Sequence, residues 1–318
     1  MDLVFFGSGA FGIPTLSALC SAHRIVAIVT QPDKPAGRGG QLTPTPIAQW
    51  ASEHAPAVRL FKPLKVNVPE VVAELRGLGA KAWVVIAFGQ KLGAGLLEGV
   101  FAINLHASLL PRWRGAAPIN AAILAGDAES GNSVITLADR MDAGEVLGQS
   151  HRAIEPLDTA GELHDALAED GPGLVLDILA SHEQGTVTRR TQDESLVTLA
   201  SKLSKEDGWV DFSADADDCR RRVHGLTPWP GVTVLLSEDG TGPGAPLKVQ
   251  RVKVEPQSSQ ELPGRLVDAR AGLVACGAGT ILRLLEVQPP GKRCMAWDEF
   301  ARGRRLGEGA RLIGRSQG

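Results

Sequence analysis

The chain has 318 residues, of which 43% are hydrophobic, and a formal net charge of -3 at pH 7. It is long and apolar enough for two domains with buried cores. No segment approaches the roughly 20 apolar residues that a membrane-spanning helix needs, and the apolar opening lacks the basic leading region of a signal peptide. We therefore expect a cytoplasmic protein with no membrane partner.

The charge is unevenly distributed along the chain. Residues 201–318 carry 18 Lys and Arg against 15 Asp and Glu, which leaves 15 against 21 for residues 1–200. A mixed solvated surface explains this balance at least as well as a nucleic-acid partner does. Charge alone therefore does not identify a partner.

The four cysteines are widely spaced, at Cys20, Cys219, Cys276 and Cys294. They form no Cys-x-x-Cys pair and have no histidine at the interval of a metal site. We expect reduced, buried thiols and no metal ion.

The first part of the chain alternates between strands and helices. The apolar run from Leu3 to Phe6 is followed by a glycine turn and an amphipathic stretch from Phe11 to Ala22. Further strands are expected at 24–30, 82–87, 133–137 and 146–154, and further helices at 68–78 and from Thr159 toward His182, where Pro172 should break or kink the helix. This alternation predicts an α/β fold with a doubly wound, mostly parallel sheet, whose ligands gather beyond the carboxyl ends of the strands.

The pattern becomes polar from about residue 184 and then changes character. Short β-prone runs at 231–236, 247–254, 264–267, 273–276 and 280–287 are separated by Gly, Pro and Asp turns. These runs predict a small, OB-like β-barrel. We expect a catalytic domain at residues 1–188, a linker at 189–206 and the barrel at 207–318.

The segment from Asn104 to Pro111 has the residues of a catalytic centre. Asn104 and His106 are two apart on an expected strand and so share a face. An amide and an imidazole side by side can donate hydrogen bonds to one developing oxyanion, and a carboxylate such as Asp142 can fix the imidazole tautomer and help carry a proton. This arrangement indicates acyl-type transfer. The alternative interpretation is a half-buried structural histidine and an ordinary loop aspartate.

The stretch from Asn104 to Gly126 resembles the formyltransferases that use 10-formyltetrahydrofolate, whose shared mark is Asn-x-His-x-Ser-Leu-Leu-Pro with a later Asp. The resemblance implies that Asn104 and His106 contact the formyl group, that Asp142 assists proton transfer, and that a cis bond precedes Pro111. It also implies a folate site, for which the matching residues are Phe88, Gly89, Ser108, Leu109, Leu110, Pro111, Asp139 and Gly144.

Over nearly its whole length the chain resembles the methionyl-tRNA formyltransferases. Residues 30–46 contain too many turn residues for regular structure and should form a mobile exposed loop, similar to the loop with which this family holds the acceptor arm. The segments around Lys202 to Gly208, Pro228 to Gly231 and Gly291 to Met295 match as well. The resemblance implies initiator methionyl-tRNA and folate, but no DNA, as partners in translation initiation. It places tRNA contacts at Lys34, Arg38, Lys202, Lys205, Lys292 and Arg293, although each charge alone is more often simply solvated.

Other functions stay open at this point. A formyltetrahydrofolate hydrolase would use water as the acceptor, and in a formyltransferase acting on a small amine this second domain should be absent or different. The sequence Gly7-Ser-Gly9-Ala-Phe-Gly12, with Asp33 about 20 residues on, also fits a dinucleotide fingerprint. That pattern would indicate a nicotinamide enzyme or a non-catalytic nucleotide-binding module. However, Asp33 lies outside the second expected strand, and the formyltransferases begin with a similar strand, glycine turn and helix.

Overall fold

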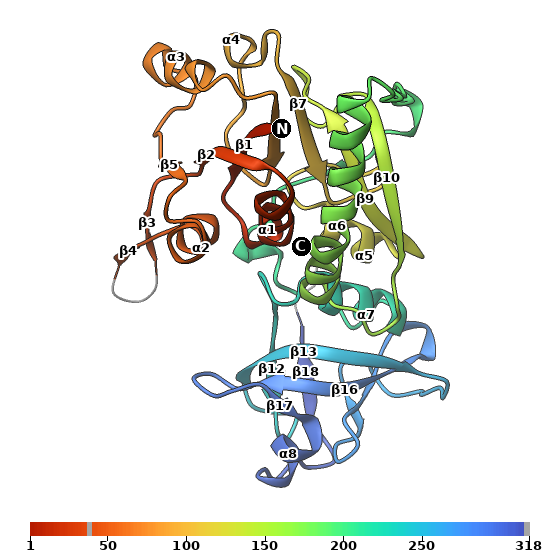
Figure 1. Ribbon diagram of the computed structural model, residues 1–318. Helices are drawn as coiled ribbons and strands as arrows, with labels where there is room; N and C mark the ends of the chain where they lie inside the picture. Colours follow the sequence, from red (N-terminus) through yellow and green to blue (C-terminus); the bar gives the residue numbers. More distant parts are fainter. Residues whose placement is uncertain (37–39, 315–318) are drawn as a thin grey trace. The chain divides into compact units, whose positions relative to one another are not determined.

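The computed structural model describes residues 1–36 and 40–314, which form two compact units (Figure 1). The first unit comprises Met1–Gly115, Ser130–Arg152 and His164–Leu199. The second comprises Ala116–Glu129, Ala153–Leu163 and the chain from Ala200 onward. Two short stretches from earlier in the sequence therefore fold with the C-terminal part.

A seven-stranded sheet organises the first unit, in the order β10-β9-β7-β6-β1-β2-β5. The strands β1 (Asp2–Gly7), β2 (Arg24–Val29), β5 (Arg59–Phe61), β6 (Ala82–Ile86) and β7 (Phe101–His106) run parallel, whereas β9 (Glu129–Thr136) pairs antiparallel with β7. The strand β10 (Val146–Ala153) forms one edge. The mostly parallel α/β sheet predicted from the sequence is confirmed.

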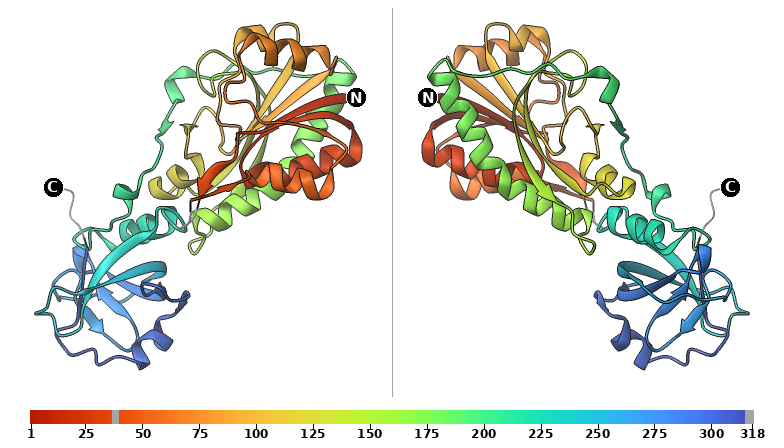
Figure 2. Two further views of the ribbon diagram at one scale, coloured as in Figure 1. Left: turned by 90° about the vertical axis from the view of Figure 1, so that its left-hand side faces the viewer. Right: turned by 90° about the vertical axis from the view of Figure 1, so that its right-hand side faces the viewer.

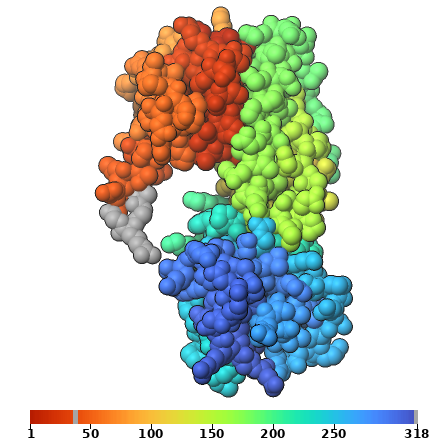
Figure 3. Space-filling view, turned by 60° about the horizontal axis from the view of Figure 1, so that its bottom comes forward, coloured from red at the N-terminus to blue at the C-terminus, as the bar shows by residue number. Residues whose placement is uncertain are grey.

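Helices cover both faces of this sheet (Figure 2). On one face, α1 (Ile13–Ala22) lies beside α6 (Ala160–Glu183), and their red and green surfaces meet in Figure 3. The contact is close, because a Cβ atom on Gly171 of α6 would lie 3.1 Å from Thr15 of α1 and 2.7 Å from Leu105 of β7. This packing buries one face of the sheet.

The opposite face carries α3 (Pro69–Gly77) and α4 (Ala94–Leu97). Leu75 of α3 and Leu96 of α4 pack with Phe6 and Trp83 of the sheet, and all four side chains are almost completely buried. Burial on both faces explains why the strands read as nearly continuous apolar runs.

The helix α6 begins with a capping box. Thr159 N donates to Glu162 Oε2 at 3.0 Å, and Glu162 N donates to Thr159 Oγ1 at 3.3 Å. The sequence predicts that Pro172 breaks or kinks this helix; the proline lies inside α6 without ending it, so a break does not occur. Leu167 and Val175, on either side of the proline, are completely buried, and this packing outweighs the loss of one backbone hydrogen bond.

Residues 30–46 are more regular than their composition predicts. The short strands β3 (Lys34–Ala36) and β4 (Gln41–Thr43) pair antiparallel, so the expectation of a loop without regular structure is wrong. Both strands of a two-stranded sheet are edge strands, and Pro35 is therefore tolerated there. The helix α2 (Pro46–His54) follows, capped by Thr45, whose Oγ1 accepts from Ala48 N at 3.1 Å.

A nearly closed antiparallel barrel forms most of the second unit, as predicted. Its strands are β12 (Val232–Ser237), β13 (Ala245–Glu255), β14 (Leu266–Asp268), β15 (Leu273–Ala275), β16 (Ile281–Gln288), β17 (Met295–Ala296) and β18 (Arg311–Ile313). The order is β14-β15-β16-β13-β12-β18, with β17 paired to β16. Backbone hydrogen bonds from Leu266 N to Ala310 O (2.9 Å) and from Leu312 N to Gly264 O (2.7 Å) join the two edges.

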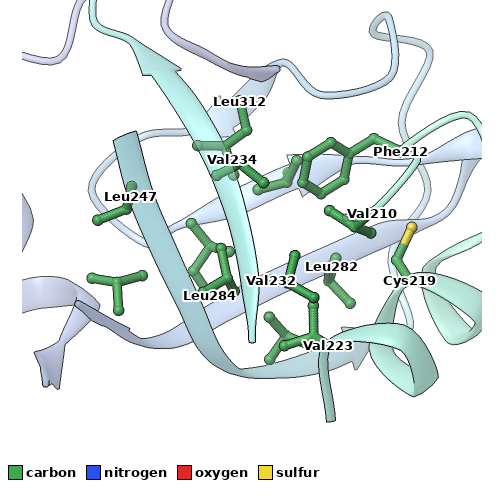
Figure 4. Close-up of a cluster of buried hydrophobic side chains, with 14 of the residues drawn as sticks. Val210, Phe212, Cys219, Val223, Val232, Val234, Leu247, Leu282, Leu284 and Leu312 are labelled. Carbon is green, nitrogen blue, oxygen red and sulfur yellow. The ribbon is translucent and has the colours of Figure 1, made fainter. Parts of the chain in front are cut away.

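Apolar side chains from all sides of the barrel meet in its centre (Figure 4). Val234 comes from β12, Leu282 and Leu284 come from β16, and Val223 comes from α7 (Ala216–Gly225). Each of them is at most 2% exposed, so the barrel has a core of its own. The residues of α7, ADDCRRRVHG, are mostly polar, so the sequence pattern did not predict this helix.

The second unit also contains α5 (Pro118–Ala125), α8 (Trp297–Arg302) and residues 153–163. Asn120 Nδ2 of α5 donates to the carbonyl oxygen of Gly225 in α7 at 2.7 Å. Arg251 of β13 bonds Glu162 Oε1 at 2.6 Å and the carbonyl oxygen of Leu157 at 2.7 Å. Polar contacts thus fix both inserted stretches to the C-terminal part.

No helix among the described residues is long and apolar enough to cross a membrane. The four cysteines are free thiols. Cys219 and Cys276 are buried as expected, whereas Cys20 is partly exposed and Cys294 is exposed, so the expectation of burial is wrong for these two.

Candidate active site

Asn104 and His106 lie on β7, near the carboxyl ends of the parallel strands. Asn104 pairs with Val85 of β6 and with Ile135 of β9, so its strand is held on both sides. His106 is 7% exposed, while Asn104 is partly exposed. Within the described residues the Asn104 amide makes no hydrogen bond, so its N–H groups are available to a ligand.

The protonation of the His106 ring follows from its neighbour on Nε2. This nitrogen lies 2.9 Å from the carbonyl oxygen of Trp113. A carbonyl oxygen only accepts, so Nε2 carries a hydrogen and donates it. Nδ1 is then bare in the neutral ring and carries the second hydrogen in the imidazolium. The tautomer is therefore fixed by Trp113, the role that the sequence reasoning gave to Asp142.

Asp142 faces the same ring from the loop between β9 and β10. Its Oδ2 lies 3.6 Å from His106 Nδ1 and accepts a hydrogen bond from Gly115 N at 2.9 Å. The side chain is 13% exposed, and the backbone is left-handed with φ 53°. Asn and Asp adopt this conformation more readily than other residues with a Cβ. The structure thus brings His106 and Asp142 together across 36 positions of sequence.

The turn after β7 is held mainly by its own polar groups. A cis bond joins Leu110 to Pro111, as the resemblance implied. Ser108 is completely buried, and its Oγ donates to the carbonyl oxygen of Arg112 at 2.7 Å. Leu110 is buried against Ile135, and its N–H donates to Ser133 Oγ at 3.0 Å.

The other residues expected to bind folate differ in whether a side chain or only the backbone is accessible. The Phe88 ring packs edge-on against Phe6 in the core, with centroids 5.5 Å apart, so this residue offers its backbone rather than its ring. Gly89 follows with φ 81°, which favours glycine. The side chain of Asp139 is 99% exposed and lies 3.8 Å from Lys91.

Gly144 is required by close packing in the loop that carries Asp142. A Cβ atom there would lie 1.7 Å from the carbonyl oxygen of Thr136. The carbonyl oxygen of Gly144 accepts a hydrogen bond from Gln192 Nε2 at 2.7 Å. Leu109 is partly buried and packs closely against Gly131. A Cβ atom on Gly131 would lie 2.7 Å from Leu109 Cδ2.

The glycines of the opening turn are also explained by packing. A Cβ atom on Gly7 would lie 2.5 Å from the Phe5 ring, and one on Gly12 would lie 3.1 Å from the same ring. Ser8, between the glycines, donates to the carbonyl oxygen of Phe88 at 3.0 Å. In a dinucleotide-binding enzyme, Asp33 would accept a hydrogen bond from a ribose hydroxyl. Here its Oδ1 accepts one from Lys62 Nζ at 2.6 Å.

The described residues among the expected tRNA contacts are exposed and occur in both units. Lys34 lies on β3, and Arg38 lies outside the described residues. On the second unit, Lys202, Lys205 and Lys292 are exposed, and Arg293 is exposed but bonded to Glu299 at 2.7 Å.

Two buried polar residues near Asp142 were not identified from the sequence. Arg114 is 3% exposed and Gln192 is 7% exposed, and Arg114 Nε donates to Gln192 Oε1 at 3.0 Å. Arg114 lies two residues after Arg112 in a basic run, and Gln192 lies in the polar segment 189–206. The sequence around each residue therefore gives no indication that its side chain is buried. Among the described residues, no group of three or more His, Cys, Asp or Glu is arranged to hold a metal ion.

The residue patterns of two known families match this chain. The family described as "Formyl transferase" matches residues 1–179, and "Formyl transferase, C-terminal domain" matches residues 202–305. The chain is thus an enzyme of the formyl-transfer class.

Relatives define the family more closely. The chain is 40% identical over 316 residues to the methionyl-tRNA formyltransferase of Methylococcus capsulatus, covering 96% of this chain and 100% of that protein. It is 41% identical over 306 residues to that of Afipia carboxidovorans, covering 95% of this chain and 96% of that protein. The chain belongs to the methionyl-tRNA formyltransferase family.

Solved structures of more distant enzymes share the fold. WlaRD, a sugar 3N-formyl transferase, gives a TM-score of 0.65 at 12% identity and covers 92% of this chain and 99% of its own. An N-formyltransferase from Helicobacter canadensis gives 0.64 at 14% identity and covers 89% of this chain and 98% of its own. At this level of identity the likeness concerns the fold alone.

Proposed function

We propose that this enzyme transfers the formyl group of 10-formyltetrahydrofolate to the α-amino group of methionine on initiator tRNA. The observation that carries the proposal is the identity of about 40% with methionyl-tRNA formyltransferases over nearly the whole chain. The proximity of His106 to Asp142, with Asn104 two residues away on the same strand, supplies groups suited to this chemistry. The products are N-formylmethionyl-tRNA and tetrahydrofolate.

The reaction begins with a deprotonated amine. An α-amino group has a reference pKa of about 7.7 to 8.0, so much of it carries an extra proton at neutral pH. The free amine attacks the formyl carbon, forming a C–N bond while the carbonyl electrons move to oxygen. When the bond from this carbon to N10 of the folate breaks, the amine loses a proton and N10 gains one.

The Asn104 amide and His106 stabilise the negative charge that develops on the formyl oxygen. Because Nε2 is engaged by the Trp113 carbonyl, the ring donates through Nδ1, in its imidazolium form. The Asp142 carboxylate, 3.6 Å from Nδ1, accepts the proton from the amine, directly or through water. Asp142 keeps its orientation through the hydrogen bond from Gly115.

The folate binds beside Asn104, His106 and Asp142. Phe88 and Gly89 offer backbone polar groups at the end of β6 to the heteroaromatic edge. The turn of Ser108, Leu109, Leu110 and Pro111, together with Asp139 and Gly144 of the opposite loop, completes the pocket. The basic residues Lys34, Arg38, Lys202, Lys205, Lys292 and Arg293 contact tRNA phosphates.

Product analysis tests the proposal against its rivals. The protein is incubated with 10-formyltetrahydrofolate and, in separate reactions, with charged initiator tRNA, with water alone, and with small amines. We expect formylation of the methionyl-tRNA at a rate far above the release of formate. Release of formate regardless of tRNA would identify a hydrolase, and preferential formylation of a sugar-nucleotide or glycinamide-ribotide amine would identify a small-amine enzyme.

A further inference from the structure

The loop that carries Asp142 is held by one side chain from a distant part of the sequence. Gln192 Nε2 donates to the carbonyl oxygen of Asp142 at 2.7 Å and to that of Gly144 at 2.7 Å. The two N–H groups of a single amide thus bridge the carbonyls on either side of Ala143. Gln192 is 50 positions from Asp142 and 7% exposed, so these bonds are shielded from water.

Arg114 sets the orientation of that amide. Its Nε donates to Gln192 Oε1 at 3.0 Å, so the oxygen of Gln192 points to Arg114 and both N–H groups point to the loop. Arg114 is itself fixed, because its NH2 group bonds Glu194 Oε1 at 2.8 Å and its backbone N–H bonds the carbonyl oxygen of Thr198 at 3.0 Å. Arg114 immediately precedes Gly115, whose N–H bonds the Asp142 carboxylate.

The bridge acts at a strained position. Asp142 is left-handed with φ 53°, a conformation that a residue with a Cβ leaves readily unless its surroundings hold it. Rotation of this backbone would move Oδ2 away from His106 Nδ1. The hydrogen bonds from Gln192 go to the backbone of this loop, not to His106 or the Asp142 carboxylate. By holding that backbone, Gln192 sets the direction in which the carboxylate points.

We propose that Gln192, oriented by Arg114, is a positioning residue that holds Asp142 in the geometry needed for formyl transfer. This inference rests on the proposed function, because it acts through the role of Asp142. Its chemical requirement is specific: position 192 must donate two hydrogen bonds to the loop while accepting one from Arg114.

Two substitutions of nearly equal size test this requirement. Gln192→Leu removes every hydrogen bond of the side chain. Gln192→Glu keeps the acceptor for Arg114 but turns a lone-pair oxygen toward the two carbonyls. We expect both variants to lower kcat about 10- to 100-fold, with the KM for folate and for tRNA changed less than about twofold, because misplacement of a reacting group acts on turnover.

A double-mutant cycle separates positioning from general damage. In an Asp142→Asn background, Gln192→Leu should cost no further activity, because its effect passes through the carboxylate. As a matched control, Gln250→Leu removes a side-chain amide that bonds Gln288 at 3.0 Å in the barrel, and it should leave kcat unchanged. Thermal unfolding of each variant shows that the protein compared is folded.

The outcomes distinguish this inference from the function on which it rests. Unchanged kcat in both Gln192 variants, alongside a large loss in Asp142→Asn, would overturn the inference and leave the proposed function intact. Additive losses in the double mutant would also overturn it. Full activity of Asp142→Asn would remove the role of Asp142 itself, and the inference with it.

Discussion

His106 and Asp142 face each other at 3.6 Å between Nδ1 and Oδ2, a separation longer than a hydrogen bond, while the other ring nitrogen is bonded to the Trp113 carbonyl. The ring therefore has one free nitrogen, and that nitrogen points toward the carboxylate. A proton on His106 Nδ1 would therefore lie close to the Asp142 carboxylate. The two side chains thus make a pair that can both stabilise an oxyanion and carry a proton.

Asn104→Ala is expected to lower kcat about 10²- to 10³-fold, the usual cost of removing one oxyanion donor. Folate affinity should change little, because the amide acts mainly in the transition state. Single-turnover formylation and equilibrium folate binding measure the two effects. Asn120→Ala, which removes an amide bonded to Gly225 in the second unit, serves as the control. A loss of folate affinity with unchanged turnover would contradict the role of Asn104.

Asp142→Asn tests the carboxylate itself. The amide oxygen of Asn can still accept from Gly115 N, so the loop should keep its shape while losing its charge. We expect kcat to fall about 10²-fold or more, as for loss of a general base. The pH profile of kcat is the second measurement, and the variant should lose the limb that depends on proton removal. A normal profile with normal turnover would rule the base out.

Lys202→Ala and Lys205→Ala should raise the KM for tRNA and leave the KM for folate unchanged. Each lost phosphate contact should reduce the slope of log affinity against log salt by about one. Lys253→Ala removes an exposed lysine of the barrel outside the proposed contact set and is the control. Equal effects of all three substitutions would mean that only overall charge matters.

Gly7→Ala should destabilise the protein by about 1 to 3 kcal/mol, because its Cβ would lie 2.5 Å from the Phe5 ring. Gly9→Ala is the matched control within the same motif, since its Cβ would meet Ala87 at an ordinary 3.5 Å. Urea unfolding of both variants measures the difference. A dinucleotide site would instead make Gly9 the sensitive position, visible as a loss of nucleotide binding.

The buried residue His224 should make stability depend on pH. Burial, followed by the charges of Arg220 and Arg251, lowers the pKa of His224 from 6.5 to about 4. The unfolded chain then binds a proton at higher pH than the native protein does, so stability is fully present above pH 6.5. It falls by about 3 kcal/mol as the pH drops from 6.5 to 4, at 1.36 kcal/mol per pKa unit.

Urea unfolding across this pH range checks the slope. His224→Gln keeps an acceptor for Val252 N, which now donates to His224 Nε2 at 3.1 Å, and it should flatten the slope. His54→Gln replaces an exposed histidine and should leave the slope as it is. An unchanged slope in His224→Gln would show that other groups cause the pH dependence.

The sequence predicted the elements with strong local patterns. The sheet of the first unit and most barrel strands follow from apolar runs and turn residues, and the shared face of Asn104 and His106 follows from strand alternation alone. By contrast, α7 was not recognised, since its sequence is polar and its few apolar residues, such as Val223, are buried only by the barrel.

The remaining parts of the site depend on long-range contacts. The distance between His106 and Asp142 is set by two loops that meet at Gly115, and no local pattern encodes that meeting. Gln192 and Arg114 are polar residues whose burial results from satisfied hydrogen bonds rather than apolar character. Sequence periodicity detects burial of apolar side chains, so it gave no sign of these two.

The two stretches that fold with the C-terminal part determine how this protein can be divided. Cutting the chain near residue 200 would leave the Asn120 amide without the Gly225 carbonyl, and Glu162 without Arg251. An isolated N-terminal fragment would thus carry orphaned polar groups and a helix stripped of its packing partner. Swapping the barrel between relatives should succeed only when α5 and residues 153–163 are exchanged together with it.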